Sequence, residues 1–289
     1  MRVAVVACGE MGGGIARRLQ ARGAEVFTSL AGRSEASRAR AVASGLTVID
    51  DDAALIAGVE VFLSVVPPAT ARALAERFAP ALERAGGKVL YADCNAVAPS
   101  TVRAIAKTVA ATGSPFVDAG LIGGPPKEDD PGPRLYASGD AASRLAALRA
   151  FGLDVRVLTG GIGAASGLKL AYASLTKGLS ALGVAAAVGA ASEGVSAALA
   201  AELAASRPAM ASALARGMPR MYPKAYRFSG EMEEIARFLG ETPAAEIFLG
   251  AAGIYEEVAA AWKAAGQDAA LLRQIGAAFP PEHSAERTA

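Results

Sequence analysis

The stretch that decides the fold is VAVVACGEMGGGIA, residues 3–16. A short run of β-forming residues enters a glycine-dense turn, and a helix-forming segment from Ile15 to Arg22 leaves it. Glycines let a backbone turn sharply and approach a pyrophosphate, and the amides at the start of the following helix attract the anion. Strand, turn and helix in this order predict a dinucleotide-binding site.

The glycine template departs from the usual pattern at one position. The G-x-G-x-x-G motif falls on residues 7–12, with Ala7 in place of the first glycine. The predicted contacts to the cofactor are Gly9, Glu10, Met11 and Gly12. The alternative interpretation is a glycine-rich turn that only closes the joint between a strand and a helix.

Composition bounds the class of protein. A chain of 289 residues holds one large domain or two ordinary ones, and 53% apolar residues supply a sizeable core. The 29 basic and 28 acidic residues give a net charge of +1, which does not suggest nucleic acid or a membrane surface as a partner. Because the chain begins directly with a strand, no signal peptide is expected.

Metal and histidine chemistry are not expected from the residues present. Cys8 and Cys94 show no metal-ligand spacing, and His283 near the end of the chain is the single histidine. The two cysteines fit packed thiols in a reducing compartment, so we predict a cytoplasmic protein without a metal site.

Strand and helix signals alternate through the first half of the chain. Strands are predicted at 3–7, 25–28, 47–49, 59–66, 88–92, 116–122, 134–138 and 155–158. Helices are predicted at 11–22, 34–44, 68–85 and 99–111, with shorter helical segments from residues 50 and 141. This alternation predicts an α/β fold, a doubly wound Rossmann-type domain over residues 1–160.

The second half of the chain is predicted to be helical. From Ile162 to about Gly276 the sequence is alanine-rich without a convincing strand, so residues 161–289 are predicted to form an all-helical domain for substrate binding and dimerisation. Its most apolar stretch, Gly178–Ser192, is shorter than the roughly 20 residues that span a bilayer. We predict a core helix there, and no membrane association.

Cofactor preference is predicted from the residues after the second strand. An NAD site usually places an acidic residue there to bind the ribose hydroxyls, and this chain has none in residues 26–34. Arg33 and Ser34 are suited instead to bind a 2′-phosphate, which favours NADP, with NAD as the alternative. The competing interpretation is a solvated Arg33 and a Ser34 that only caps a helix.

Several later residues are candidates on their own. They are Val66 and Pro67 beside the nicotinamide ribose, Asn95 as a contact to cofactor or substrate, Gly123 and Gly124 as amide donors to a carboxylate, and Lys169 as a proton donor or acceptor. Partial burial favours the neutral form of a lysine amine and suits it to such a role. Each also has an ordinary interpretation: strand punctuation, a helix cap, a loop or a solvated lysine.

The joint order of these motifs resembles the β-hydroxyacid dehydrogenase family, which includes 3-hydroxyisobutyrate and 6-phosphogluconate dehydrogenases. The likeness covers the whole length and is most specific at Gly9-Glu10-Met11-Gly12, Ser64-Val65-Val66-Pro67, Asp118-Ala119 with Gly123-Gly124, and Gly161-x-Gly163 leading to Lys169. The resemblance implies that the third motif binds substrate and that Lys169 is the catalytic acid/base. It is closest to a bacterial branch labelled 6-phosphogluconate dehydrogenase-like, whose helical domain the stretch from Tyr222 to Met232 resembles.

The chain departs from the family pattern at three positions. The family usually has Asn four residues after the lysine, where this chain has Ala173, and Ser before the glycine pair, where it has Ile122. Asn95 stands where Ser or Thr is common, and Tyr172 or Asn95 are the candidates to compensate for the missing amide. These changes imply a carboxylate-bearing substrate unlike 3-hydroxyisobutyrate or 6-phosphogluconate.

The sequence therefore predicts an NAD(P)-dependent oxidoreductase, NADP favoured, that interconverts an alcohol and a carbonyl on a small hydroxy acid or related polar metabolite. Lys169 is the predicted acid/base, Asn95, Gly123, Gly124 and Tyr172 are predicted to position the substrate, and Arg227 to anchor an anion. The family resemblance and the Ala/Gly-rich helices imply a homodimer. Two alternatives stay open: an imine reductase that uses NADPH on a C=N bond, and a dinucleotide-binding protein without catalysis.

Overall fold

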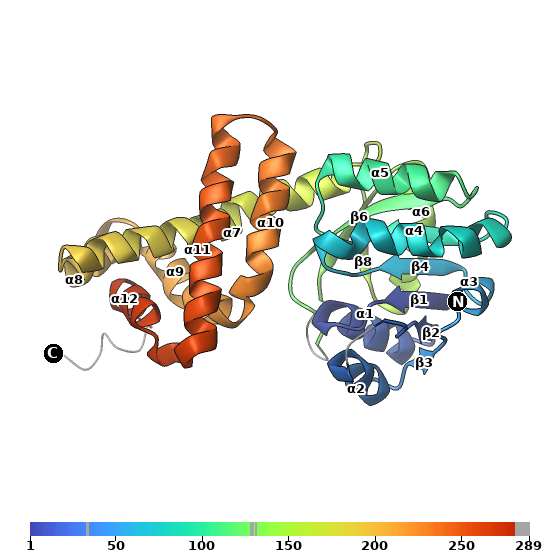
Figure 1. Ribbon diagram of the computed structural model, residues 1–289, viewed down its shortest axis with the longest axis horizontal. Helices are drawn as coiled ribbons and strands as arrows, with labels where there is room; N and C mark the ends of the chain where they lie inside the picture. Colours follow the sequence, from blue (N-terminus) through green and yellow to red (C-terminus); the bar gives the residue numbers. More distant parts are fainter. Residues whose placement is uncertain (33–34, 128–129, 131, 281–289) are drawn as a thin grey trace. The chain divides into compact units, whose positions relative to one another are not determined.

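The computed structural model describes residues 1–32, 35–127, 130 and 132–280. The chain divides into two compact units, Met1–Leu170 and Ala171–Ala289 (Figure 1). The division falls inside a long helix that starts at Ala164, beyond the composition change near residue 160 that the sequence analysis used as the boundary. Each unit is described separately below.

The first unit is built on one eight-stranded sheet with strand order β3-β2-β1-β4-β5-β6-β7-β8. The strands are β1 Arg2–Val6, β2 Glu25–Thr28, β3 Thr47–Val48, β4 Val61–Ser64, β5 Leu90–Asp93, β6 Phe116–Ile122, β7 Arg134–Ser138 and β8 Asp154–Val157. All neighbours pair in parallel except β6 and β7. The carboxyl ends of β1 to β6 therefore lie along one edge of the sheet, where ligands of such folds bind.

Helices cover both faces of this sheet. They are α1 Glu10–Ala21, α2 Glu35–Ala43, α3 Asp52–Ala57, α4 Pro68–Arg84, α5 Pro99–Ala110, α6 Ala142–Leu145 and the 3₁₀ turn η1 Ala146–Phe151. Helices α1 and α6 bury their apolar side chains against one face, and α3, α4 and α5 against the other. Figure 1 shows α4 and α5 side by side. The doubly wound fold predicted from the sequence is confirmed.

The strands are apolar because helices cover both faces of the sheet. Residues Val3 to Val6 of β1 are all buried, because this strand lies inside the sheet and helices cover both of its faces. Strands β2, β6 and β7 have the predicted bounds. Strand β4 is shorter than the predicted 59–66 at both ends. The N–H of Val59 bonds back to Ile56 after α3, and Val66 donates its N–H to the Asn95 side chain and so leaves the ladder.

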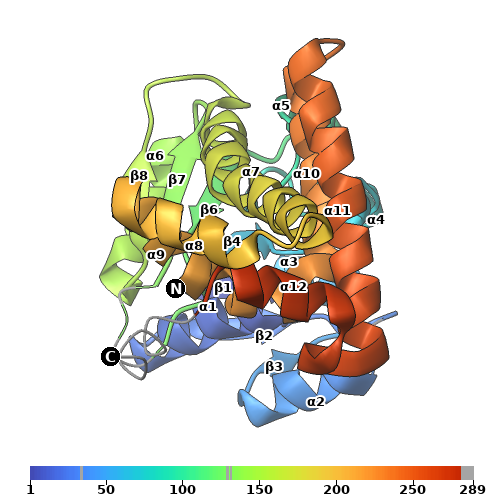
Figure 2. The same cartoon turned by 90° about the vertical axis from the view of Figure 1, so that its left-hand side faces the viewer.

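The second unit is all-helical, as predicted. Its helices are α7 Ala164–Ser192, which begins in the first unit, α8 Ser196–Ser206, α9 Pro208–Met221, η2 Tyr222–Lys224, α10 Ala225–Leu239, α11 Pro243–Ala265, η3 Gly266–Asp268 and α12 Ala270–Ala278. Helices α10 and α11 run side by side, joined by a short turn (Figure 2). The core between helices includes the fully buried Met232, Ile235, Tyr255 and Val258.

Helix α7 has two different faces. Ala181, Val184 and Ala187 are buried in the helical core, which agrees with the predicted core helix. In the described part of the chain α7 is the one helix with the length and composition of a membrane span, but only 33% of its most apolar window is buried. The opposite face carries exposed leucines, a feature that the alanine-rich composition did not predict.

Candidate active site

The glycine turn places open backbone at the carboxyl end of β1. Gly9 is the N-cap residue of α1, without a side-chain hydrogen bond to the first turn. A Cβ added at Gly9 would meet no atom within 4 Å, whereas one at Gly12 would lie 2.0 Å from the carbonyl oxygen of Ala7. Gly12 therefore lets the helix pack on the strand end, and Gly9 leaves room for a ligand. No side chain caps this helix N-terminus, which suits the first turn of α1 to a pyrophosphate.

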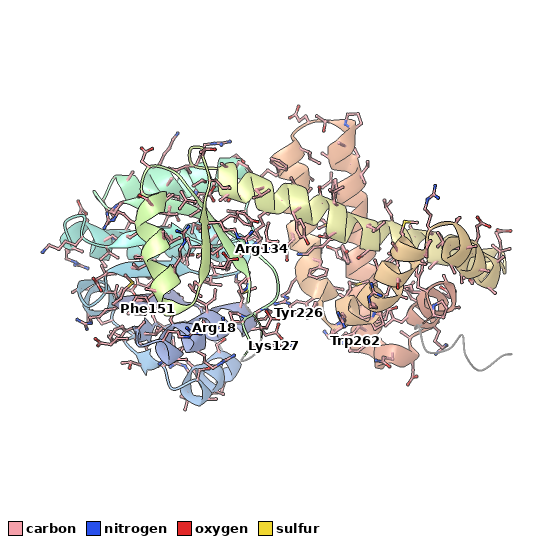
Figure 3. All side chains as sticks on the ribbon, turned by 180° about the vertical axis from the view of Figure 1, so that it is seen from behind. Arg18, Lys127, Arg134, Phe151, Tyr226 and Trp262 are labelled. Atoms are coloured by element: carbon pink, nitrogen blue, oxygen red, sulfur yellow. The ribbon has the colours of Figure 1, made fainter. Side chains whose placement is uncertain are left out.

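Helix α1 also holds the loop that follows β6. A Cβ at Gly14 would lie 2.9 Å from Cδ of Pro126, so the glycine allows the loop to approach the helix. Arg18 of α1 donates to the carbonyl oxygen of Lys127 at 2.7 Å and to that of Asp130. Figure 3 shows Arg18 and Lys127 near one another. The dinucleotide turn and the predicted substrate loop are thereby tied together.

The predicted carboxylate-binding glycines lie at the start of that loop. Gly123 has φ of +129°, a conformation that other residues rarely adopt, and its Cβ would lie 3.0 Å from Cα of Pro133. Gly124 has open space at its Cβ position. Only glycine fits at position 123, and Gly124 leaves room for a ligand.

Asn95 joins the loops that follow β4 and β5. Its side-chain oxygen accepts the N–H of Val66 at 2.7 Å, and its amide nitrogen donates to Ser64 Oγ at 2.8 Å and to Asp93 Oδ2 at 2.9 Å. The residue is 2% exposed. Because both amide protons are used inside the protein, Asn95 shapes this part of the sheet edge, and any donation to a ligand has to compete with these bonds.

Asp93 is a buried carboxyl group that sequence reasoning did not single out. Burial raises its pKa to about 7, hydrogen bonds from Asn95 oppose the rise, nearby Asp118 adds to it, and the Lys169 ammonium lowers it. Asp93 and Asp118 are register partners on β5 and β6. Lys169 therefore lies within electrostatic reach of a buried pair of carboxyl groups at the sheet edge.

Asp118 anchors the helix that carries Lys169. Its carboxylate accepts the N–H of Gly163 at 2.9 Å, the N–H of Ser166 at 3.1 Å, Ser166 Oγ at 2.6 Å and Ser138 Oγ at 3.0 Å. It is fully buried. A carboxylate at a helix N-terminus satisfies orphan amides and complements the dipole. Asp118 thus sets where α7 starts relative to β6.

Lys169 lies against β6. A Cβ at Gly120 would lie 2.6 Å from the carbonyl oxygen of Ala165 and 3.2 Å from Cβ of Lys169, so Gly120 allows α7 to pack directly on the strand. Lys169 is half-buried. Lys169 is thus held against the strand that ends in the glycine loop, within electrostatic reach of buried Asp93.

The predicted site residues fall into three groups. Those at the carboxyl edge of the sheet or against it come together in the first unit: Gly9, Glu10, Met11, Gly12, Val66, Pro67, Asn95, Gly123, Gly124 and Lys169. Tyr172 and Arg227 belong to the helical unit, where Tyr172 is exposed on α7 and the Arg227 guanidinium lies 5.9 Å from the Tyr226 ring centre. Arg33 and Ser34 lie outside the described residues.

Asp93 was missed by the sequence analysis, and Asp118 was quoted there only in a substrate motif, without its role at the start of α7. Each is a lone carboxylate in an otherwise apolar strand, which is the signal that could have found them. Within the described ranges no three histidine, cysteine or acidic side chains gather as metal ligands.

Two parts of the chain match known protein families. Residues 2–152 match the NAD-binding domain of 6-phosphogluconate dehydrogenase. The chain belongs to this family. Residues 190–258 match a domain of unknown function, DUF1932. The resemblance stated from the motifs is confirmed.

Relatives extend over most of the fold. An uncharacterized 28.5 kDa protein from Methanothermus fervidus is 28% identical over 182 residues, 63% of this chain and 68% of that protein. The solved structure of the conserved protein MTH1747, whose function is unknown, is 29% identical with a TM-score of 0.65 and covers 89% of this chain and 96% of its own. Mycobacterium tuberculosis 3-hydroxyisobutyrate dehydrogenase shares the fold, at 17% identity, TM-score 0.65 and coverage of 95% and 97%.

Two solved structures of this fold hold a nicotinamide cofactor. Psf3 is in complex with NADP+ and 2-OPP, at 17% identity, TM-score 0.65 and coverage of 96% and 99%. An imine reductase from Myxococcus stipitatus is in complex with NADP+, at 18% identity, TM-score 0.55 and coverage of 94% and 98%. At this level of sequence identity, both similarities show a shared fold.

Proposed function

We propose that this protein is an NAD(P)-dependent oxidoreductase, favouring NADP, that interconverts an alcohol and a carbonyl on a small carboxylate-bearing molecule. The observation that carries the proposal is the placement of Lys169 against β6, the strand that leads to the glycine pair. The uncapped α1 turn at Gly9 supports dinucleotide binding. Membership of the NAD-binding family supports the same site.

The residues that would hold the cofactor are the turn from Gly9 to Gly12, Val66 with Pro67, and Arg33 with Ser34 at a 2′-phosphate. When bound, a nicotinamide cofactor accepts or supplies the hydride. The open Cβ position of Gly9 fits a backbone that a pyrophosphate approaches closely.

Lys169 moves the proton in this proposal. In oxidation its neutral amine accepts the proton of the substrate hydroxyl at Nζ, and in reduction its ammonium protonates the forming alkoxide. The amides of Gly123 and Gly124 bind the substrate carboxylate, and Arg227 and Tyr172 are further proposed contacts. Acid–base assistance by one placed group is worth about 10²–10⁴-fold in rate.

A substrate panel tests this function. Short hydroxy acids are offered with NADP+ and with NAD+, and the matching aldehyde and keto acids with NADPH, while absorbance at 340 nm is followed. Lys169→Met should lower turnover by about 10²–10⁴-fold and leave NADPH affinity nearly unchanged. Lys107→Met, an exposed lysine of α5, is the matched control.

Other results would overturn parts of the proposal. Turnover that survives in Lys169→Met would remove Lys169 as acid/base. Reduction confined to cyclic imines would favour the imine reductase. Saturable NADPH binding with no turnover of any carbonyl or imine would favour a binding protein without catalysis.

A homodimer is also proposed, with α7 at its interface. Exposed apolar residues lie on α7 at Leu168, Tyr172, Leu175, Leu179 and Leu182. Their spacing of four, three, four and three residues repeats every seven, the pattern of a seam between two helices. A second copy of α7 would cover this stripe. We further propose a cytoplasmic location from the two free cysteines, both buried.

A further inference from the structure

The loop that follows β2, Ser29–Gly32, is held by side chains from other elements. In a doubly wound fold the ribose of the adenosine half binds at the end of this strand, and the residues after it select the cofactor. Here the loop leads in sequence to Arg33 and Ser34. How the loop is fixed therefore bears on cofactor binding.

Arg77 of α4 makes most of these bonds. Its guanidinium donates to Ser29 Oγ at 3.1 Å and to the carbonyl oxygen of Ala31 at 3.3 Å. It also forms a two-point pair with Asp52 of α3, with Nε to Oδ2 at 2.7 Å, and it lies 5.0 Å from the ring centre of buried Phe78. One planar group thus joins the loop to two helices.

A second ion pair holds the middle of the loop. Asp50 Oδ1 accepts the N–H of Leu30 at 2.7 Å, and Arg38 of α2 donates to the carbonyl oxygen of Leu30 at 3.0 Å. Arg38 and Asp50 lie 3.8 Å apart. Both backbone polar groups of Leu30 are therefore bonded to charged side chains that also attract one another.

The anchored loop borders a cavity that is wide open to solvent. This open cavity has a volume of about 580 Å³ and is lined by Ala31, Gly32, Asp50, Asp52, Arg77 and Arg84, among others. The Arg77 charge facing it is balanced by Asp52, so Arg77 is better suited to shape the wall than to bind a phosphate directly. A lysine could not replace it, because one ammonium cannot reach three acceptors in the planar geometry of a guanidinium.

We propose that Arg77, paired with Asp52, is a positioning residue for the adenosine half of the dinucleotide: it fixes Ser29 and Ala31 so that the loop and its cavity accept the nucleotide without reordering. This rests on the proposed dinucleotide binding. The nucleotide then binds a loop whose ordering is complete before binding. Without Arg77 the loop has to become ordered when the nucleotide binds, and the free energy of ordering weakens the affinity.

Direct binding tests the role without any substrate. Full-length Arg77→Lys, Arg77→Met and Asp52→Asn are titrated with NADPH by its fluorescence and with 2′,5′-ADP by calorimetry. We expect both affinities to fall by about tenfold, the size of one lost charge-assisted hydrogen bond. Arg72→Gln is the matched control, since Arg72 lies on the same helix in an exposed pair with Glu76, and it should bind like the wild type.

Hydrogen exchange separates the positioning role from the dinucleotide proposal. In Arg77→Lys the amides of residues 29–32 should exchange faster, while the thermal midpoint and exchange elsewhere in the sheet stay near wild type. A folded Arg77→Lys with wild-type NADPH affinity would overturn the inference. If the wild type binds neither probe and no NADH either, the proposed function fails, and loop exchange unchanged in Arg77→Lys would then overturn the anchoring by itself.

Discussion

The two units of this protein differ in what they bury and what they expose. In the described residues the sheet unit buries polar side chains such as Ser64, Asp93, Asn95 and Asp118, while the helical unit buries only Ser229 and Glu234. The helical unit instead exposes large apolar residues, among them Leu175, Leu179, Leu182, Ile247 and Leu249.

This difference indicates two kinds of partner. Burying a polar group is unfavourable unless it is hydrogen-bonded, and the connected set of such groups at one sheet edge fits the proposed binding of a small polar ligand. Exposed leucines in a seven-residue repeat indicate a protein surface. Variants of each unit test these assignments.

Gly12→Ala should have the largest effect on the sheet unit. Its Cβ would lie 2.0 Å from the Ala7 carbonyl oxygen, so the helix must move off the strand end. We expect a loss of about 3 kcal/mol or more in the free energy of unfolding, measured by urea denaturation. Gly9→Ala is the matched control, with no atom near its Cβ and an ordinary φ of −75°.

The control separates packing from ligand binding. Gly9→Ala should keep nearly all of the unfolding free energy and lose NADPH affinity, because its methyl group occupies the open side of the turn. Equal stability losses in the two variants would show that the glycines do not have these separate roles.

Charge on the α7 stripe should affect only assembly. Leu175→Glu with Leu179→Glu places two like charges in the proposed seam, and we expect a dimer mass in the wild type and a monomer mass in the variant by light scattering. The helical content should be unchanged, since both side chains are exposed. Leu249→Glu, exposed on α11, is the control, and a wild-type monomer would contradict the proposed interface.

Asp93→Asn should produce a pH-dependent change in stability. The folded pKa of Asp93, about 7, lies above the ordinary pKa of 3.8 for this side chain, so the folded state binds more protons between these values. Stability contributed by this group is therefore present below pH 4 and lost as pH rises to about 7. The variant lacks the buried charge, so it should gain stability relative to the wild type at pH 8 and not at pH 4.

The measurement is urea denaturation at both pH values, and only the difference between wild type and variant is read. The steepest loss for one proton is about 1.4 kcal/mol per pH unit. If the unfolding free energies of the two proteins changed in parallel with pH, Asp93 would have an ordinary pKa in the folded state.

Local order was predictable from the chain. The glycine turn, the bounds of β2, β6 and β7, and the helical second half all follow from periodicity and turn residues. Strand β4 was predicted too long, because its end depends on Val66 bonding to Asn95, a residue 29 positions away. A one-dimensional pattern carries no information about such a partner.

The candidate site divides in the same way. Lys169 and the glycines could be named from motifs, since their residue types and spacing carry the chemistry. The cap on α7 could not be predicted, because Asp118 hydrogen-bonds to Ser166, 48 positions away in the sequence. The bond from Arg77 to Ser29 spans the same separation and was not predictable either. The exposed face of α7 also depends on which neighbouring helices cover it.

Patterns along the chain were therefore enough to predict the doubly wound sheet, the dinucleotide turn, the helical second half and the candidate lysine. Short-range sterics and hydrophobic periodicity act along the chain and leave a readable pattern. The tertiary structure alone decided which carboxylates are buried, which loop Arg77 holds and which apolar residues stay exposed. Burial and hydrogen bonding depend on distances between elements, and the folded chain sets those distances.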